Sequence, residues 1–131
     1  MNREIRILIA DDHAIVRTGL AALLNTEPGL RVVGEAKNGA EAIREALRYA
    51  PDIVIMDLMM PQKDGAEATA AIRQKLPQTR VLILTTYGSS DDIAHALKSG
   101  AAGVIMKTAP NEKLIAALRK IAAGEAYIAP E

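Results

Sequence analysis

The stretch Ile53-Val54-Ile55-Met56-Asp57-Leu58-Met59-Met60-Pro61 decides the fold. Its first four residues are apolar and mostly branched, which is typical of a strand that is buried on both faces of a parallel sheet. The run ends at one carboxylate, and a short segment closed by proline follows. The stretch therefore predicts a buried strand that carries a single acid to the edge of a sheet.

Three other apolar runs end in polar residues in the same way. The first run is followed by Asp11 and Asp12, and two later runs end at Thr85 and Lys107. The carboxyl ends of parallel strands meet at one edge of a sheet, and sites in such sheets lie outside that edge. We therefore expect these four residues and Asp57 to form one polar cluster.

Apolar residues between the strands recur at helical spacing, so five strands are expected to alternate with five helices. The expected strands cover residues 5–10, 31–35, 53–57, 80–85 and 101–106. The expected inner faces of the helices are Val16, Leu20, Leu23 and Leu24; Ile43, Ala46, Leu47 and Ala50; Ala68, Ile72 and Leu76; Ile93, Ala96 and Leu97; and Leu114, Ala117, Leu118, Ile121 and Ala122. The fourth helix, expected from Ser89 to Ser99, has the thinnest apolar face.

Such alternation predicts a doubly wound, flavodoxin-like (βα)5 parallel sheet with helices on both faces. If the strand order is 2-1-3-4-5, the winding reverses between the first and third strands. Those are the strands that end in Asp11-Asp12 and in Asp57.

Composition excludes several classes of protein. A chain of 131 residues, half of them hydrophobic, suits one domain with a single core. The formal net charge is zero and there is no basic stripe, which argues against a DNA-binding surface in this segment. Cysteine is absent, which excludes disulfides and thiolate chemistry. No apolar run resembles a signal peptide or approaches the ~20 residues of a membrane span, so we expect a cytoplasmic protein.

Three carboxylates in one pocket repel one another unless one takes up a proton or a cation lies among them. Mg²⁺ (or Mn²⁺) is the economical cation, because it takes oxygen ligands and binds phosphate. A carboxylate beside it can act as a nucleophile toward phosphorus and form an aspartyl phosphate. Asp57 is the best candidate nucleophile, with the Lys107 charge and the Thr85 hydroxyl available to the phosphoryl oxygens.

Each of these residues also has an ordinary structural interpretation. Asp11-Asp12 could cap a helix, and Asp57 could cap a loop. Thr85 could be an ordinary strand residue, and Lys107 could be a solvated surface lysine. His13 is a weaker candidate base, because the position next along a helix start usually points away from the strand end. What favours a site is that the polar residues all fall at strand ends.

The strings IADDHAIVRTGL, DIVIMDLMMPQKDG, VLILTTY and GAAGVIMKT resemble the receiver domain of two-component response regulators, most closely the NarL/FixJ (LuxR-type) subfamily. The resemblance covers residues 3–124. It implies that Asp57 accepts a phosphoryl group from a sensor histidine kinase or from a small donor such as acetyl phosphate. It also implies that Asp12, Asp57 and the Met59 carbonyl bind Mg²⁺, with Asp11 acting through water.

By the same resemblance, Thr85 and Lys107 contact the phosphoryl group and transmit its presence. Met59 and Tyr87 would line the route of the water that removes it. The domain would be a switch with limited self-catalysed phosphorylation and dephosphorylation, not an enzyme with a released product. Val104 departs from the family, which often has a switch aromatic there.

The resemblance further implies a receiver in residues 1–124, the start of an interdomain linker in 125–131, and a C-terminal helix-turn-helix DNA-binding domain that is absent from this chain. Phosphorylation would favour a homodimer, through either the fourth helix with the fifth strand and helix, or the first helix with the last. A stand-alone receiver that docks to a partner protein is the alternative.

Three other classes share part of the pattern. A haloacid-dehalogenase-type phosphatase needs a second acid two residues after Asp57, where this chain has Met59. A flavodoxin-like cofactor binder needs a phosphate loop where Asp11-Asp12-His13 stands. A cobalamin-binding D-x-H-x-x-G motif needs glycine where this chain has Val16.

Overall fold

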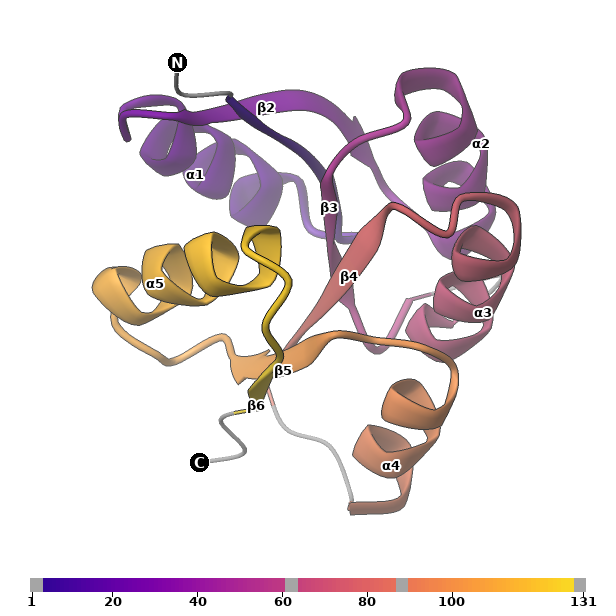
Figure 1. Cartoon of the computed structure of the whole chain (residues 1–131). Helices are drawn as coiled ribbons and strands as arrows, with labels where there is room; N and C mark the ends of the chain where they lie inside the picture. The colour runs from indigo at the N-terminus through magenta and orange to yellow at the C-terminus, as the bar shows by residue number, and fades with distance from the viewer. Residues whose placement is uncertain (1–3, 61–63, 87–89, 129–131) are drawn as a thin grey trace.

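A parallel sheet with helices on both faces forms the protein (Figure 1). The computed structural model describes residues 4–60, 64–86 and 90–128 of the chain. The strands are β1 (Ile5–Ala10), β2 (Leu30–Ala36), β3 (Ile53–Asp57), β4 (Arg80–Thr85), β5 (Gly103–Met106) and β6 (Tyr127–Ile128). The helices are α1 (Ala14–Asn25), α2 (Gly39–Tyr49), α3 (Gly65–Lys75), α4 (Ser90–Lys98) and α5 (Asn111–Ala122).

The strand order is β2-β1-β3-β4-β5-β6, and all neighbouring pairs are parallel. The predicted order 2-1-3-4-5 is therefore confirmed for the first five strands. Every residue of β3 is buried, as its unbroken apolar run predicted. The winding reverses between β1 and β3, which places the site at their carboxyl ends.

Helices α2, α3 and α4 cover one face of the sheet, and α1 and α5 cover the other (Figure 1). Neighbouring residues of a strand point to opposite faces. Leu8 thus packs in the core beneath α2, α3 and α4, while Ile7 and Ile9 pack beneath α1 and α5. Because both faces are covered, the central strands are apolar throughout and not alternately polar.

The sixth strand lies in the segment that we expected to be a linker. Tyr127 pairs with Gly103 of β5, and its N–H donates to the Ala102 carbonyl at 3.1 Å. A side chain on Gly103 would collide with the Tyr127 carbonyl, so glycine permits this close approach. The chain that follows α5 is therefore attached to the edge of the sheet.

The prediction of which α2 residues face the core is partly wrong. Leu47 is 46% exposed and Ala50 is exposed, whereas Ala42 and Ala46 are fully buried. Small side chains form the buried face of this helix, and the larger leucine lies at its flank. In α5, Ala122 is likewise exposed, although the rest of the predicted face is buried or partly buried.

Helix α4, predicted to have the thinnest apolar face of the five, has Ala96 as the one buried side chain in its described residues. Helix α1 is similar, since only Leu24 is fully buried. The predicted helix start at Ser89 lies outside the described residues. Among the described helices, none has the length and hydropathy that a transmembrane span requires.

Candidate functional site

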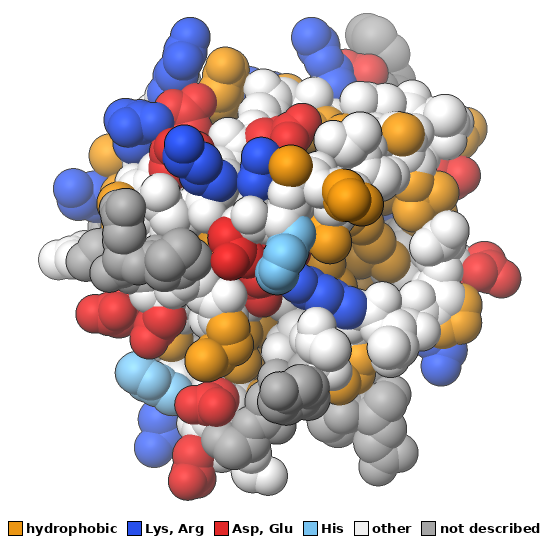
Figure 2. All heavy atoms as spheres, turned by 180° about the vertical axis from the view of Figure 1, so that it is seen from behind, with side chains coloured by type: hydrophobic (Ala, Val, Ile, Leu, Met, Phe, Trp, Pro, Cys, Tyr) orange, Lys and Arg blue, Asp and Glu red, His pale blue; other side chains and the backbone are white. Residues whose placement is uncertain are grey.

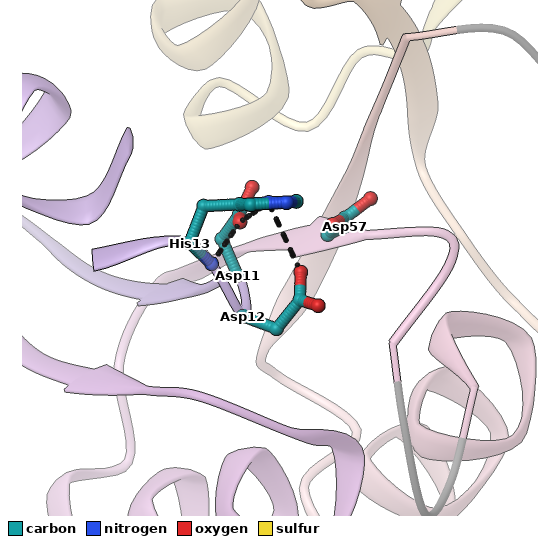
Figure 3. Close-up of side chains that lie close together, drawn as sticks. All are labelled: Asp11, Asp12, His13 and Asp57. Carbon is teal, nitrogen blue, oxygen red and sulfur yellow. Dashed lines mark hydrogen bonds and ion pairs between the residues drawn. The ribbon is translucent and has the colours of Figure 1, made fainter. Parts of the chain in front are cut away.

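Two buried acids lie at the carboxyl ends of β1 and β3. Asp11 directly follows β1, and its N–H donates to the Ala36 carbonyl of β2 at 3.0 Å. Asp57 is the last residue of β3 and is 4% exposed. Figure 3 shows both carboxylates close to Asp12 and His13. From behind the view of Figure 1, the molecular surface shows acidic side chains directly beside a histidine and a basic side chain (Figure 2). The two strand ends therefore converge on one acidic cluster, as predicted.

Lys107 lies between the two buried acids. Its Nζ is 2.8 Å from Asp11 Oδ2 and 3.3 Å from Asp57 Oδ2. The residue directly follows β5, and its backbone N–H donates to the Thr85 carbonyl at 2.7 Å. One ammonium group thus joins the ends of three strands.

Thr85 is the buried last residue of β4, paired with Met106 immediately before Lys107. The structure therefore brings the predicted phosphoryl-contact pair together beside Asp57. Val104, at the predicted switch-aromatic position, is fully buried in the core opposite Ile83. Tyr87, predicted to affect phosphoryl lifetime, lies outside the described residues.

The segment after Asp57 is held close to that acid. The Met59 N–H donates to Asp57 Oδ1 at 3.3 Å, and the Met59 residue is 63% exposed. Gly65 donates its N–H to the Leu58 carbonyl at 2.9 Å, and a Cβ at Gly65 would collide with the Asp57 carbonyl. Glycine at this position therefore lets α3 begin directly against the acid. The role of the Met59 carbonyl as a metal ligand stays a prediction.

The prediction that the His13 side chain points away from the strand end is wrong. Its Nδ1 lies 3.0 Å from Asp11 Oδ1 and 3.1 Å from Asp12 Oδ1. The His13 N–H also donates to Asp11 Oδ1 at 2.8 Å, a local turn that an aspartate side chain readily forms. This turn brings the imidazole back toward the acids. The residue that precedes α1 as its N-cap is His13 itself, without a side-chain capping bond.

Arg17, one helical turn into α1, stabilises the backbone turn between Asp11 and His13. The sequence alone did not identify this residue. Its Nη1 donates to the Asp11 carbonyl at 2.7 Å, and its Nε lies 3.2 Å from Glu35 Oε1 of β2. The guanidinium therefore fixes the backbone that carries the acids. The signal in the sequence is an arginine four residues after His13, one helical turn into α1.

The charges at the site shift the pKa values of three groups. Burial raises the pKa of Asp57, and the nearby Asp11 charge raises it further. The Lys107 charge lowers this pKa but offsets only part of the increase. Burial also disfavours the charged form of Asp11, but hydrogen bonds from Lys107 and His13 outweigh it, so the Asp11 pKa is lowered. For Lys107, burial is outweighed by the two acids, and its pKa is raised.

The residues fit a divalent cation. Asp11, Asp12, His13 and Asp57 each offer a ligand atom, and these atoms lie within 4.8 Å of one another. The cluster contains three carboxylates, and Lys107 pairs with two of them, Asp11 and Asp57, so negative charge remains to be neutralised. Oxygen donors with surplus negative charge are what Mg²⁺ binds.

A carboxylate held between a cation site and an ammonium group can act as a nucleophile toward a phosphoryl group. The surrounding positive charges would neutralise the phosphoryl oxygens, which is most of what such a transfer requires. The site has no second acid two residues after Asp57, as a phosphatase of the haloacid-dehalogenase type would need.

The family described as the response regulator receiver domain matches residues 7–119. The oxygen regulatory protein NreC of Staphylococcus carnosus is 44% identical over 127 residues, which cover 96% of this chain and 58% of NreC. NreC of Staphylococcus haemolyticus is 44% identical over 124 residues, 94% of this chain and 57% of that protein. The chain thus spans a little over half the length of these relatives.

Two solved structures share the fold closely. A two-component response regulator of the LuxR family from Aurantimonas sp. SI85-9A1 has a TM-score of 0.91 and 39% identity, over 97% of this chain and 91% of the other. The signal receiver domain of a regulator named NarL from Mycobacterium tuberculosis has a TM-score of 0.89 and 32% identity, over 94% of this chain and 99% of the other. The chain therefore belongs to the response regulator receiver domain family, and it is a receiver domain of the NarL/LuxR type.

Proposed function

We propose that the domain is a phosphorylation-dependent switch in which Asp57 accepts a phosphoryl group from a sensor histidine kinase or from acetyl phosphate. The observation that carries this proposal is the placement of Asp57. Its buried carboxylate lies 3.3 Å from Lys107 Nζ, which also pairs with Asp11. The acid is thereby oriented, and countercharge is in place before a donor arrives.

In the proposed transfer, one Asp57 oxygen attacks phosphorus while the bond from phosphorus to the donor breaks. With a phosphohistidine donor, the ring nitrogen keeps the electron pair of the broken N–P bond and takes up one proton from solvent, so the donor leaves as neutral imidazole; acetyl phosphate leaves as acetate. The product is an acyl phosphate on Asp57. Asp12, Asp57 and the Met59 carbonyl would hold Mg²⁺, with Asp11 acting through water, and the ion would supply charge neutralisation.

The switch itself rests on Thr85 and α4. A phosphoryl group adds about −1.5 to −2 charge, and the Thr85 hydroxyl and Lys107 ammonium are the donors we assign to its oxygens. Because Ala96 is the one buried side chain of α4 in its described residues, a shift of this helix disrupts little packing. Phosphorylation would therefore favour a minor arrangement of α4 and not create a new one. Val104 is fully buried in the core, so the proposed switch involves no aromatic side chain at that position.

The output of the switch is proposed to be dimerisation that controls an attached DNA-binding domain. The chain covers 58% of NreC, which is named as an oxygen regulatory protein, so such relatives contain further sequence for an output. A similar structure is described as a DNA-binding response regulator of the LuxR family from Staphylococcus aureus. This favours the attached-domain proposal over a stand-alone receiver. The receiver boundary at residue 124 and the cytoplasmic location are part of the same proposal.

The switch can be tested with beryllofluoride, which mimics a phosphoryl group and was used with a related receiver domain. With Mg²⁺ and beryllofluoride, we expect amide NMR shifts at Thr85, Lys107 and α4, and a dimer in size-exclusion chromatography. Asp57→Asn should show neither change. Unchanged spectra in the wild type, under conditions where Mg²⁺ binding is confirmed, would contradict the proposal.

A further inference from the structure

The imidazole of His13 has no part in the proposed phosphoryl transfer, yet it faces the cation site. Its side chain is 64% exposed, but Nδ1 lies 3.0 Å from Asp11 Oδ1 and 3.1 Å from Asp12 Oδ1. Figure 3 shows the ring lying across the acids. A nitrogen ligand is thus placed among the carboxylates that would hold a metal.

These distances suit shared coordination of one ion. Neighbouring ligands of an octahedral ion with bonds of ~2.1 Å lie about 3.0 Å apart. The observed separations from the imidazole to the two carboxylate oxygens match that edge. The two carboxylate oxygens of Asp11 have different partners: Oδ2 faces Lys107, and Oδ1 faces the His13 imidazole. The oxygen on the metal side is therefore not the one that pairs with the ammonium.

We propose that His13 is a metal ligand that makes this site prefer nitrogen-binding divalent ions, such as Ni²⁺ or Co²⁺, over Mg²⁺. The inference rests on the proposed metal site and adds a ligand to it. Imidazole binds first-row transition metals well, whereas Mg²⁺ is held by oxygen ligands and water. A transition-metal ion gains the imidazole in addition to the oxygen ligands of the proposed site. Mg²⁺ gains nothing from His13.

The chain provides a matched control. The sequence contains two histidines, and the second, His95, is exposed on α4. Tag-free wild type, His13→Gln and His95→Gln are titrated calorimetrically with Ni²⁺ and, separately, with Mg²⁺ at pH 7.5. We expect His13→Gln to lose at least about tenfold in Ni²⁺ affinity and to change less than about twofold for Mg²⁺. His95→Gln should match the wild type for both ions.

Pulsed electron paramagnetic resonance of bound Mn²⁺ gives a second readout that does not depend on the folding of a variant. Coupling to a directly bound imidazole nitrogen is expected in the wild type and in His95→Gln, and its loss in His13→Gln. Equal Ni²⁺ affinities for wild type and His13→Gln, or no nitrogen coupling in the wild type, would overturn the inference. If Mg²⁺ still binds in that case, the proposed magnesium site survives; if neither ion binds, both fail.

Discussion

Lys107 reaches across the end of β4 to place its ammonium 3.3 Å from the Asp57 carboxylate on β3. The same Nζ lies 2.8 Å from Asp11 Oδ2, so one cation serves two buried acids. Pairs of this kind bring large desolvation costs, and removal of one partner leaves an uncompensated charge.

Replacement of Lys107 with methionine should destabilise the metal-free protein by about 3 kcal/mol, because Asp11 and Asp57 lose their shared countercharge. Mg²⁺ should recover part of the loss. Urea unfolding with and without Mg²⁺ measures both effects. Lys113→Met is the control, since Lys113 is exposed on α5. Equal stability of the two variants without metal would show that the Lys107 pair does not hold the site together.

Asp57→Asn should stabilise the metal-free protein at neutral pH. The pKa of Asp57 is raised in the folded state by burial and by Asp11, so ionisation at that position costs folding free energy. A carboxyl with a raised pKa contributes most stability below its unfolded pKa and loses it as the pH rises through the folded pKa. The advantage of the variant should therefore shrink as the pH is lowered.

Asp11→Asn should change the stability at neutral pH in the opposite direction from Asp57→Asn. Hydrogen bonds from Lys107 and His13 outweigh burial and lower the Asp11 pKa, so its stabilising effect is present at neutral pH and lost in acid. This variant should be less stable than the wild type at neutral pH. Thermal melts of both variants between pH 2 and pH 8 compare them directly, because the lowered Asp11 pKa places its loss of stability below the ordinary pKa of an aspartate. Shifts of the same sign at neutral pH would refute the assigned pKa directions.

Mg²⁺ should raise the melting temperature of the wild type, and EDTA should reverse the change. A ligand at a hundred times its dissociation constant adds about 2.7 kcal/mol of stability. The Asp12 side chain is 31% exposed and is a proposed direct ligand. Asp12→Asn should therefore lose most of the Mg²⁺ effect while its metal-free stability changes little. A full Mg²⁺ shift in this variant would remove Asp12 from the ligand set.

Gly65→Ala should destabilise the protein by about 1–3 kcal/mol, because a Cβ at this position would collide with the Asp57 carbonyl. Gly19→Ala is the matched control: Gly19 lies within α1 and a Cβ there meets no atom within 4 Å. That control should gain about 0.5–1 kcal/mol from the higher helix propensity of alanine. Chemical denaturation of both variants tests the contrast, which fails if both change in the same direction.

Much of the fold could be predicted because the central strands are apolar on both faces. The β3 run has no polar residue before Asp57, and such a run suits only a covered parallel strand. The placement of Asp11, Thr85 and Lys107 beside Asp57 follows from one rule about strand ends. No detail of side-chain packing was needed for it.

The remaining features depend on contacts that no periodicity records. β6 is two residues long, too short to show a pattern, and it requires the missing side chain of Gly103. The direction of His13 depends on the hydrogen bond from its N–H to Asp11 and on the contacts of its ring with Asp11 and Asp12. The role of Arg17 depends on the nearby Asp11 carbonyl and Glu35. Leu47 lies outside because small residues form the buried face of α2.

Intact mass spectrometry after incubation with acetyl phosphate shows whether Asp57 accepts a phosphoryl group. Wild type and Asp57→Asn are compared with Mg²⁺ and with EDTA. We predict a gain of one phosphoryl group in the wild type with Mg²⁺ and in neither of the controls. A phosphoryl gain in Asp57→Asn, or none in wild type that has been shown to bind Mg²⁺, would contradict the account.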